Sequence, residues 1–192
     1  MKFLKLEKVA DGKYLKKYEL TYENKAGKEK KYEIASRKEL NSLEDLGREP
    51  SGVSIVATKG DKLVLLREFR MAINKSIYNL IAGMMEKDED IETCICRELY
   101  EETGLTVTKI TKILKPSYSA VGITDTKTYV AFVEVDGEFT DHTSDNEEIS
   151  AKFYTTEEVE ELLETEDFSS RAQVVSHFFV ELQKQKQSLK SS

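Results

Sequence analysis

The chain has 192 residues, of which 39% are hydrophobic and 34% are charged, and its formal net charge at pH 7 is -7. This composition is typical of a globular domain, and no apolar run approaches the roughly 20 residues that a membrane helix needs. The acidic balance disfavours nucleic acid and anionic membranes as partners. Two cysteines without a His or Cys cluster predict no zinc site and no disulfide framework, so we expect a reducing, cytoplasmic location.

The first part of the chain predicts a small β-rich domain. Lys, Tyr, Leu and Ile interleave in residues 13–24 and 28–37, which are joined by the turn-like sequence NKAGK. Two or three strands bury little by themselves, so we expect them to pack on the rest of the chain or on a second copy of it. A proline and two glycines in residues 46–52 interrupt the pattern. The predicted domains are therefore residues 1–46 and residues 47–192.

From residue 52 onward, short strands alternate with helical segments, which predicts a mixed α+β fold with helices around a mostly β centre. Runs rich in β-branched and aromatic residues indicate the strands, and the sequence KGD indicates a hairpin turn between the first two. The strands predicted in this way are residues 53–58, 62–69, 76–83, 107–115, 127–135 and 149–155.

Three segments of the same region predict helices. Acidic residues in the first turn and Gly104 just past the end delimit a helix over residues 90–103. Thr155 and Glu158 form a capping-box pattern for a second helix that runs to about Glu164. A closing amphipathic helix over residues 170–185 has its apolar residues at helical spacing, and these are Val174, Val175, Phe178, Phe179 and Leu182. The polar tail, residues 186–192, is expected to be disordered.

Three carboxylates have a distinctive position on the first of these helices. At about 100° per residue, Ile91, Cys94 and Ile95 define an apolar stripe. Glu98 and Glu102 fall in the same stripe and Glu101 lies at its edge, whereas a solvated charged face would lie opposite. Like charges this close repel each other, and a hard divalent ion, Mg²⁺ or Mn²⁺, suits a site made only of oxygen ligands. The alternative is a set of surface acids on a helix that is rotated differently.

The spacing of this stretch resembles the Nudix box, with all nine defining positions matched. It reads Gly83, five residues, Glu89, seven residues, Arg97-Glu98-Leu99, one residue, Glu101-Glu102, one residue, Gly104-Leu105. At ordinary residue frequencies, the chance of an accidental match is below about one in a hundred thousand. The resemblance implies the Nudix fold, an α/β/α sandwich around a mixed sheet. It also implies Mg²⁺-dependent hydrolysis of a nucleoside diphosphate that is linked to another moiety.

The resemblance also implies roles for residues of the box. Glu89 and Arg97 are interpreted as a structural ion pair that braces the loop, and the helical wheel turns Arg97 away from the apolar stripe. Glu101 is the ligand that we also expect to be essential for turnover. The metal ligands carried over from the family are the carboxylates of Glu98, Glu101 and Glu102 and the backbone carbonyl of Ala82.

A separate carboxylate is needed to take the proton of the attacking water. In the ADP-ribose pyrophosphatase branch of the family, this base comes from a loop well after the box. The acidic sequence SDNEEIS, immediately before a predicted strand, is in a suitable place. Glu147 is the first choice for the base, followed by Glu148 and Asp145. A solvated run of charges is the alternative interpretation of the same loop.

Three features resemble the ADP-ribose pyrophosphatase branch in particular. The sequence LREFR places Arg67 and Arg70 three apart, where they are expected to hold phosphate or ribose as bidentate donors. The sequence NLIAG resembles the lead-in E-x-P-A-G, although Asn79 and Ile81 replace the Glu and the Pro. The β-rich N-terminal segment matches the small domain by which such enzymes form swapped homodimers. Candidates for stacking on the adenine are Tyr14, Tyr18, Tyr22 and Tyr32.

One feature departs from that branch. The branch has S-P-G beyond the box, whereas this chain has Ala120-Val121-Gly122 and retains a nearby acid, Asp125, as a candidate substrate ligand. Proline restricts the backbone, so its loss is expected to reshape the pocket. ADP-ribose, cleaved to AMP and ribose 5-phosphate, is therefore the first expectation, with GDP-mannose or another nucleoside diphosphate sugar as the alternative. A non-catalytic nucleotide-binding regulator of the same fold is the alternative from another class.

Overall fold

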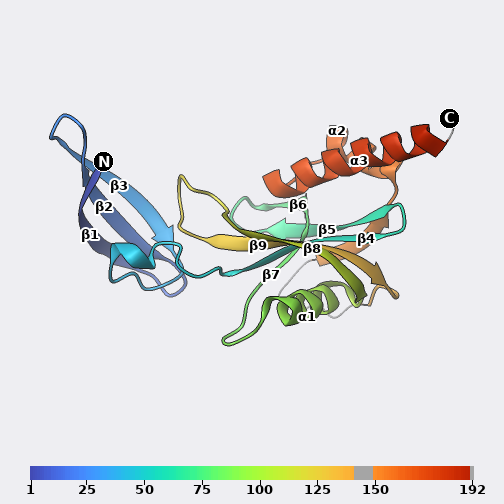
Figure 1. The fold of residues 1–192 in the computed structure, drawn as a ribbon, viewed down its shortest axis with the longest axis horizontal. Coiled ribbons are helices and arrows are strands. Elements are labelled where there is room, and N and C mark those ends of the chain that lie inside the picture. The colour runs from blue at the N-terminus through green and yellow to red at the C-terminus, as the bar shows by residue number, and fades with distance from the viewer. Residues whose placement is uncertain (141–148, 191–192) are drawn as a thin grey trace. The chain divides into compact units, whose positions relative to one another are not determined.

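The computed structural model describes residues 1–140 and 149–190, and Figure 1 gives the arrangement of the elements. Contacts divide the chain into two compact units. The N-terminal unit comprises Met1–Ser51 and Pro116–Tyr129, and the C-terminal unit comprises Gly52–Lys115 and Val130–Ser192. The N-terminal unit thus includes a segment from far along the chain. The functional division at residues 46 and 47 stays a prediction.

An antiparallel sheet of three strands forms the centre of the N-terminal unit. Its strands, hydrogen-bonded in this order, are β1 (Lys2–Asp11), β2 (Lys16–Glu23) and β3 (Glu29–Ser36). The two segments predicted from their pattern are β2 and β3. Two register shifts in β1 interrupt the alternation that would have identified it. A short 3₁₀ turn, Leu43–Asp45, follows, and a small apolar core includes Tyr18, Leu20, Ile34 and Leu40.

A seven-stranded sheet forms the centre of the C-terminal unit. Its main path is β10-β5-β4-β9-β8, with β6 paired to β5 and β7 paired to β4. The strands are β4 (Gly52–Lys59), β5 (Lys62–Arg70), β6 (Lys75–Asn79), β7 (Ile81–Met84), β8 (Thr106–Tyr118), β9 (Lys127–Asp136) and β10 (Ile149–Tyr154). Residues 76–83, predicted as one strand, form two, because the chain changes partner at Leu80. There the Leu80 N–H donates to the Asn79 side chain at 2.9 Å.

Helices cover both faces of this sheet (Figure 1). Helix α1 (Ile91–Thr103) lies on one face, where it contacts β4, β7 and β10. Helices α2 (Thr156–Thr165) and α3 (Ser170–Lys190) pack together on the opposite face. The predicted capping box at Thr155 and Glu158 is present at the start of α2. The predicted α+β class, with helices on both sides of a central sheet, is confirmed.

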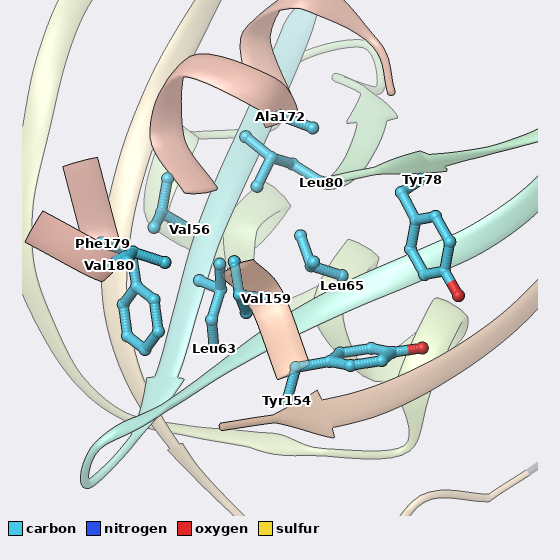
Figure 2. Packing of buried hydrophobic residues seen from close by; sticks show 10 residues of the cluster. All are labelled: Val56, Leu63, Leu65, Tyr78, Leu80, Tyr154, Val159, Ala172, Phe179 and Val180. Atoms are coloured by element: carbon cyan, nitrogen blue, oxygen red, sulfur yellow. The ribbon is translucent and has the colours of Figure 1, made fainter. Parts of the chain in front are cut away.

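An apolar core fills the space between the sheet and the α2–α3 pair (Figure 2). Tyr78 packs edge-to-face against Tyr154, with ring centroids 5.8 Å apart, and it stacks on Phe168 at 5.3 Å. Burial of an aliphatic or aromatic side chain stabilises the fold by about 1.5–3 kcal/mol. The other buried members of the core are Val56, Leu63, Leu65, Leu80, Val159, Ala172, Phe179 and Val180.

The closing helix α3 differs from its prediction in two respects. Val174, Phe178 and Leu182, which were expected on its buried face, are each more than half exposed. Phe179 is buried as expected, Val175 packs against the core, and Val180, which was not predicted, is buried as well. Adjacent apolar residues gave the helix two apolar faces, and packing chose one of them. The helix also continues to Lys190. The expectation that the tail is disordered is therefore wrong for residues 186–190. Neither α3 nor another helix in the described ranges is long and apolar enough to cross a membrane.

Candidate functional site

Helix α1, which carries the predicted carboxylates, has both of its ends fixed by local interactions. The Asp90 carboxylate accepts hydrogen bonds from the N–H groups of Glu92 and Thr93, both at 3.0 Å. At the other end, Gly104 adopts a left-handed conformation with φ of 75°, and its N–H donates to the Tyr100 carbonyl at 2.7 Å. The predicted limits of this helix are confirmed, so the carboxylates lie on its last two turns.

Glu98 is the carboxylate that the helix buries. Its residue is 9% exposed, and it follows the apolar Cys94 and Ile95 on the same docked face. A Cβ atom added to Gly83 in β7 would overlap the Glu98 carboxylate, so any larger residue at this crossing would have to displace that carboxylate. Burial raises the pKa of Glu98, while the neighbouring Arg97 acts in the opposite direction. The predicted path of the apolar stripe into a carboxylate is therefore present at Glu98.

Arg97 connects Glu89, which precedes the helix, with two carboxylates of its last two turns. Its Nε and Nη2 atoms donate to the two oxygens of Glu89, at 2.8 and 2.9 Å. Its Nη1 atom donates to Glu98 at 2.8 Å and to Glu101 at 3.0 Å, and Nη2 also donates to the Met84 carbonyl at 3.0 Å. The hydrogen bonds from Arg97 are the main reason that the pKa of Glu89 falls to about 2.

The predicted ion pair between Glu89 and Arg97 is thus observed. The helical wheel did not predict the further contacts that Arg97 makes. The wheel turned Arg97 away from the carboxylate stripe, but it places only the Cβ direction. The guanidinium group, at the end of a long side chain, reaches around to Glu98 and Glu101. No pattern in the sequence signals this second contact, because side-chain torsions decide it.

The remaining box carboxylates differ in exposure. The Glu101 side chain is 56% exposed, in agreement with its place at the edge of the stripe. One oxygen of Glu102 accepts a hydrogen bond from the Ala82 N–H at 3.3 Å. Two neighbouring residues of β7, Ala82 and Gly83, therefore lie against Glu102 and Glu98 respectively. The structure brings the predicted ligand residues together around the crossing of α1 and β7.

The donor set fits a hard divalent ion in its chemistry. Carboxylates and backbone carbonyls are the oxygen ligands that Mg²⁺ prefers. Within residues 1–140 and 149–190, no group of three His, Cys, Asp or Glu side chains has an arrangement that could hold a metal. Arg97 provides the positive charge beside Glu98 and Glu101. The assignment of these carboxylates as metal ligands therefore remains a proposal.

The two candidate substrate arginines lie on opposite faces of β5. Side chains alternate along a strand, so residues three apart point to different sides. Leu63 and Leu65 of the same strand belong to the core under α2 and α3, which places Arg67 on that face. Arg70 lies on the other face, on which α1 packs, together with Glu68, whose carboxylate accepts a hydrogen bond from Arg70 Nη1 at 3.2 Å.

Asp125 and three of the four candidate tyrosines have defined surroundings in the N-terminal unit. One oxygen of Asp125 accepts a hydrogen bond from the Gly47 N–H at 3.1 Å. Asp125 also lines a cavity of about 270 Å³ with Tyr22 and Tyr32. Tyr18 is buried, and its hydroxyl accepts a hydrogen bond from the Leu40 N–H. Tyr18 is therefore a core residue, whereas Tyr22 and Tyr32 border the cavity.

Tyr118 is a cavity residue that the sequence did not predict. It lines the same cavity as Asp125 and lies under the Lys127 ammonium group, 5.5 Å from the ring centroid. It follows a predicted strand, where nothing in the sequence distinguishes a cavity residue from an ordinary surface aromatic. The candidate bases Glu147, Glu148 and Asp145 lie outside the described residues.

Comparison with known families agrees with this geometry. Residues 48–178 match the family model described as the NUDIX domain, which is more than half of the chain. The chain therefore belongs to the Nudix family, and the resemblance inferred from the spacing of the box is confirmed. The matched range includes the whole of α1 and of the sheet strands that contact it.

Two relatives within this family are similar to the chain over about two thirds of its length. The chain is 32% identical over 129 residues to an ADP-ribose pyrophosphatase of Bacillus subtilis (strain 168), which covers 67% of the chain and 63% of the relative. It is 29% identical over 136 residues to an ADP-ribose pyrophosphatase of Saccharomyces cerevisiae, covering 68% and 57%. In both cases the match spans less than two thirds of the relative's length.

A solved structure described as an ADP compounds hydrolase has the same fold. The two folds superpose with a TM-score of 0.73, over 96% of this chain and 94% of the other, at 22% sequence identity. An identity this low supports the fold and not the activity. The likeness extends over nearly all of both chains, so it includes the N-terminal sheet as well as the family domain.

Proposed function

We propose that this protein hydrolyses the diphosphate bond of a nucleoside diphosphate linked to another moiety, in a Mg²⁺-dependent reaction. The proposed substrate is ADP-ribose, and the products are AMP and ribose 5-phosphate. The observation that carries the proposal is the complete box, with Glu98 buried against Gly83 and Glu102 beside Ala82. The names of the two relatives described above support the choice of ADP-ribose.

The box residues would hold the metal. Glu98, Glu101, Glu102 and the Ala82 carbonyl supply oxygen ligands of the kind that Mg²⁺ takes. When bound, such an ion neutralises the charge of the diphosphate and lowers the pKa of a bound water. Glu89 accepts two hydrogen bonds from Arg97, and this pair would keep the loop before α1 in place. The side chains would thus position the diphosphate rather than react with it.

Two further roles complete the proposed site. Arg70 lies on the same face of the sheet as α1, and it would bind a phosphate oxygen, whereas Arg67 keeps only its sequence-based assignment. The Glu147 carboxylate, or else Glu148, would take the proton of the attacking water. Both choices of base rest on the sequence of their loop. The assignment of Glu147 or Glu148 as the base is a proposal, as is the role of Glu101 as an essential metal ligand.

The N-terminal unit is proposed to bind the nucleobase of the substrate and to form the homodimer interface. Tyr22, Tyr32 and Asp125 border one cavity, and this supports a role for them in contacting a planar ring and its polar edge. The homodimer follows from the resemblance to the branch, as does the division into domains at residues 46 and 47. We place the protein in the cytoplasm, and the two free cysteines support this location.

GDP-mannose is the second candidate substrate. Val121 stands where the branch has proline, it is 73% exposed, and it lines the same cavity as Tyr32 and Asp125. A loop without the proline can adopt other backbone conformations. The shape of this cavity in the presence of substrate then decides which nucleobase fits. This observation favours a changed specificity over a changed reaction.

A turnover panel tests the proposal. The purified protein would be assayed with ADP-ribose, GDP-mannose, UDP-glucose, NADH and diadenosine polyphosphates, with Mg²⁺ and then with Mn²⁺. We expect ADP-ribose to be cleaved fastest. Glu101→Gln should lower turnover by at least about 100-fold, because a bound metal contributes several kcal/mol of charge stabilisation. The matched control is Glu92→Gln, because Glu92 is an exposed acid in the first turn of the same helix. This variant should cleave the substrate at the wild-type rate.

The other outcomes are equally informative. Faster cleavage of GDP-mannose would replace the substrate and keep the reaction. Full activity in Glu101→Gln would contradict its role as an essential ligand. If no compound turns over with either metal, the enzymatic proposal fails and a nucleotide-binding regulator takes its place.

A further inference from the structure

A buried acid on strand β5 is not part of the Nudix box. Glu68 is 8% exposed and lies in the middle of the β5–β6 pair. In the register of this pair, Glu68 is opposite Ile77, and Asn79 lies two residues further along. Diagonal neighbours of this kind share one face of a sheet. Glu68, Asn79 and Arg70 therefore project from the same face, which is the face that α1 covers.

The Glu68 carboxylate is held by two donors from different strands. One oxygen accepts a hydrogen bond from Asn79 Nδ2 at 2.5 Å, and the other accepts one from Arg70 Nη1 at 3.2 Å. A carboxylate with so little access to water is tolerated only when it is paired and hydrogen-bonded. The hydrogen bond from the Asn79 amide is the shorter of the two. Asn79 is therefore as much a partner of this acid as Arg70 is.

Asn79 is fully engaged, which fixes the direction of its amide. Its carbonyl oxygen accepts hydrogen bonds from the Leu80 N–H at 2.9 Å and from the Ser169 hydroxyl at 2.6 Å. With two donors on the oxygen, the NH₂ group must face Glu68. Asn79 thereby ties Glu68 to the corner at Leu80, where the chain leaves β6 and enters β7. Strand β7 carries Ala82 and Gly83, the residues that lie against the box carboxylates.

Arg70 is anchored at one edge only. Its side chain is 55% exposed, and its single ion pair in the described part of the chain is the contact with Glu68. The Nε and Nη2 donors make no hydrogen bond to the described residues. A guanidinium group that is fixed at one nitrogen presents its other donors in a planar fork suited to phosphate oxygens. The geometry thus orients Arg70 without using up its capacity to bind an anion.

We propose that Glu68 and Asn79 form a positioning pair that orients Arg70 toward a phosphate group and fixes the β6–β7 corner beside the box helix. The acid that the lead-in motif has at position 79 is supplied by Glu68 from the neighbouring strand, and the amide occupies the motif position. Both residues act through Arg70 and β7 and do not touch the substrate. The part of this proposal that concerns phosphate binding rests on the proposed function.

Exchanging the two side chains tests the pair. The four proteins are the wild type, Glu68→Gln, Asn79→Glu and the double variant, which restores an acid facing an amide in the reverse order. In the double variant, the amide introduced at position 68 retains a donor for the carboxylate introduced at position 79 and an acceptor for Arg70. Every polar group then has a partner again. Glu134→Gln, on an exposed part of β9, is the matched loss of a strand carboxylate.

Two readouts separate positioning from folding. Glu68→Gln should raise the KM for the cleaved substrate about tenfold and change kcat less, because a charged hydrogen bond to Arg70 is lost. Asn79→Glu places a second carboxylate beside the buried Glu68, and it should lower the Tm by about 4 °C or more. The double variant should recover to within about threefold of the wild-type KM and most of the Tm, a coupling that independent sites lack. Glu134→Gln should change neither quantity.

Two results would overturn the proposal. Additive losses of Tm and KM in the double variant would show that the two positions act independently. A lower Tm with an unchanged KM in Glu68→Gln would leave Glu68 with a structural role only. The Tm cycle needs no turnover, so it still tests the pair if the wild type cleaves none of the compounds. In that case the turnover result would count against the proposed function alone.

Discussion

The two faces of the central sheet are built on different principles. Under α2 and α3, the sheet contributes Leu63, Leu65 and Val56 to an apolar core that also includes two tyrosines (Figure 2). On the opposite face, where α1 packs on other strands, the protein buries two carboxylates, Glu68 of β5 and Glu98 of α1, each less than 10% exposed. An apolar core gains stability in proportion to the surface it buries. Buried acids cost desolvation, so their presence on one face supports the site that we propose there.

The charged face is tolerated because each acid has a specific partner. Arg97 donates to Glu98, and Asn79 and Arg70 donate to Glu68. Removing one partner of such a pair costs more than the pair contributes, since it leaves a buried group without compensation. The apolar face, by contrast, depends on volume and close packing. The two faces should therefore respond differently to substitution.

The largest effect on stability is expected on the apolar face. Leu63→Ala should lower the free energy of unfolding by about 2–5 kcal/mol, because Leu63 is fully buried and a cavity would remain. Turnover per folded molecule should stay unchanged. Denaturant unfolding and kcat measurements check both statements. Leu189→Ala, at a position 79% exposed, should stay within about 0.5 kcal/mol of the wild type. Equal losses in the two variants would contradict the location of the core.

A glycine on the charged face should give a smaller loss of stability with a loss of activity. The Cβ of Gly83→Ala would overlap the Glu98 carboxylate, and such overpacking costs about 1–3 kcal/mol. Because Glu98 must move, turnover should fall by about tenfold or more. Thermal melts and kcat values provide the measurement. For stability, Gly122→Ala is the control, since its nearest atom is the Tyr32 hydroxyl at 3.8 Å. Wild-type activity in Gly83→Ala would argue against a site at this crossing.

The smallest effect should be a change in pH dependence at Glu89. Its pKa falls from 4.5 to about 2 in the folded protein, mainly through the hydrogen bonds from Arg97. A depressed pKa adds stability that is present above about pH 4.5 and is lost as the pH falls toward 2. The stability difference between wild type and Glu89→Gln should therefore be largest near pH 6 and shrink below pH 4.5. Unfolding curves at several pH values in metal-free buffer measure it.

The neighbours of Glu89 make this test specific. Arg97 also contacts Glu98 and Glu101, and the pKa of Glu98 is shifted upward by burial, in the opposite direction. Protonation of Glu98 on acidification therefore offsets part of the loss. Burial is the largest cause of the shift in Glu98 and the charge of Glu89 contributes less, so most of this offset is common to both proteins. A wild-type–variant difference that stays constant from pH 7 to pH 2 would exclude the Glu89–Arg97 pair as a source of stability.

Local features of the site followed from the sequence alone. The limits of α1 were predicted because capping residues act within one turn of the helix, through Asp90 at its start and Gly104 at its end. The direction of Glu98 was predicted because helical periodicity fixes which residues share a face. The family was predicted because the spacing of the box is itself a sequence property, and the match over residues 48–178 confirms it.

Other features were decided only by tertiary structure. Strand alternation puts Arg67 and Arg70 on opposite faces of β5, but which of them shares the face that α2 and α3 cover was decided by packing. Helix α3 has two apolar faces, and packing selected the one with Phe179 and Val180. The Glu68–Asn79 contact joins residues eleven apart through the pairing of β5 with β6. Local rules fix the direction in which a side chain leaves the backbone, whereas its partners depend on which distant strand or helix lies there.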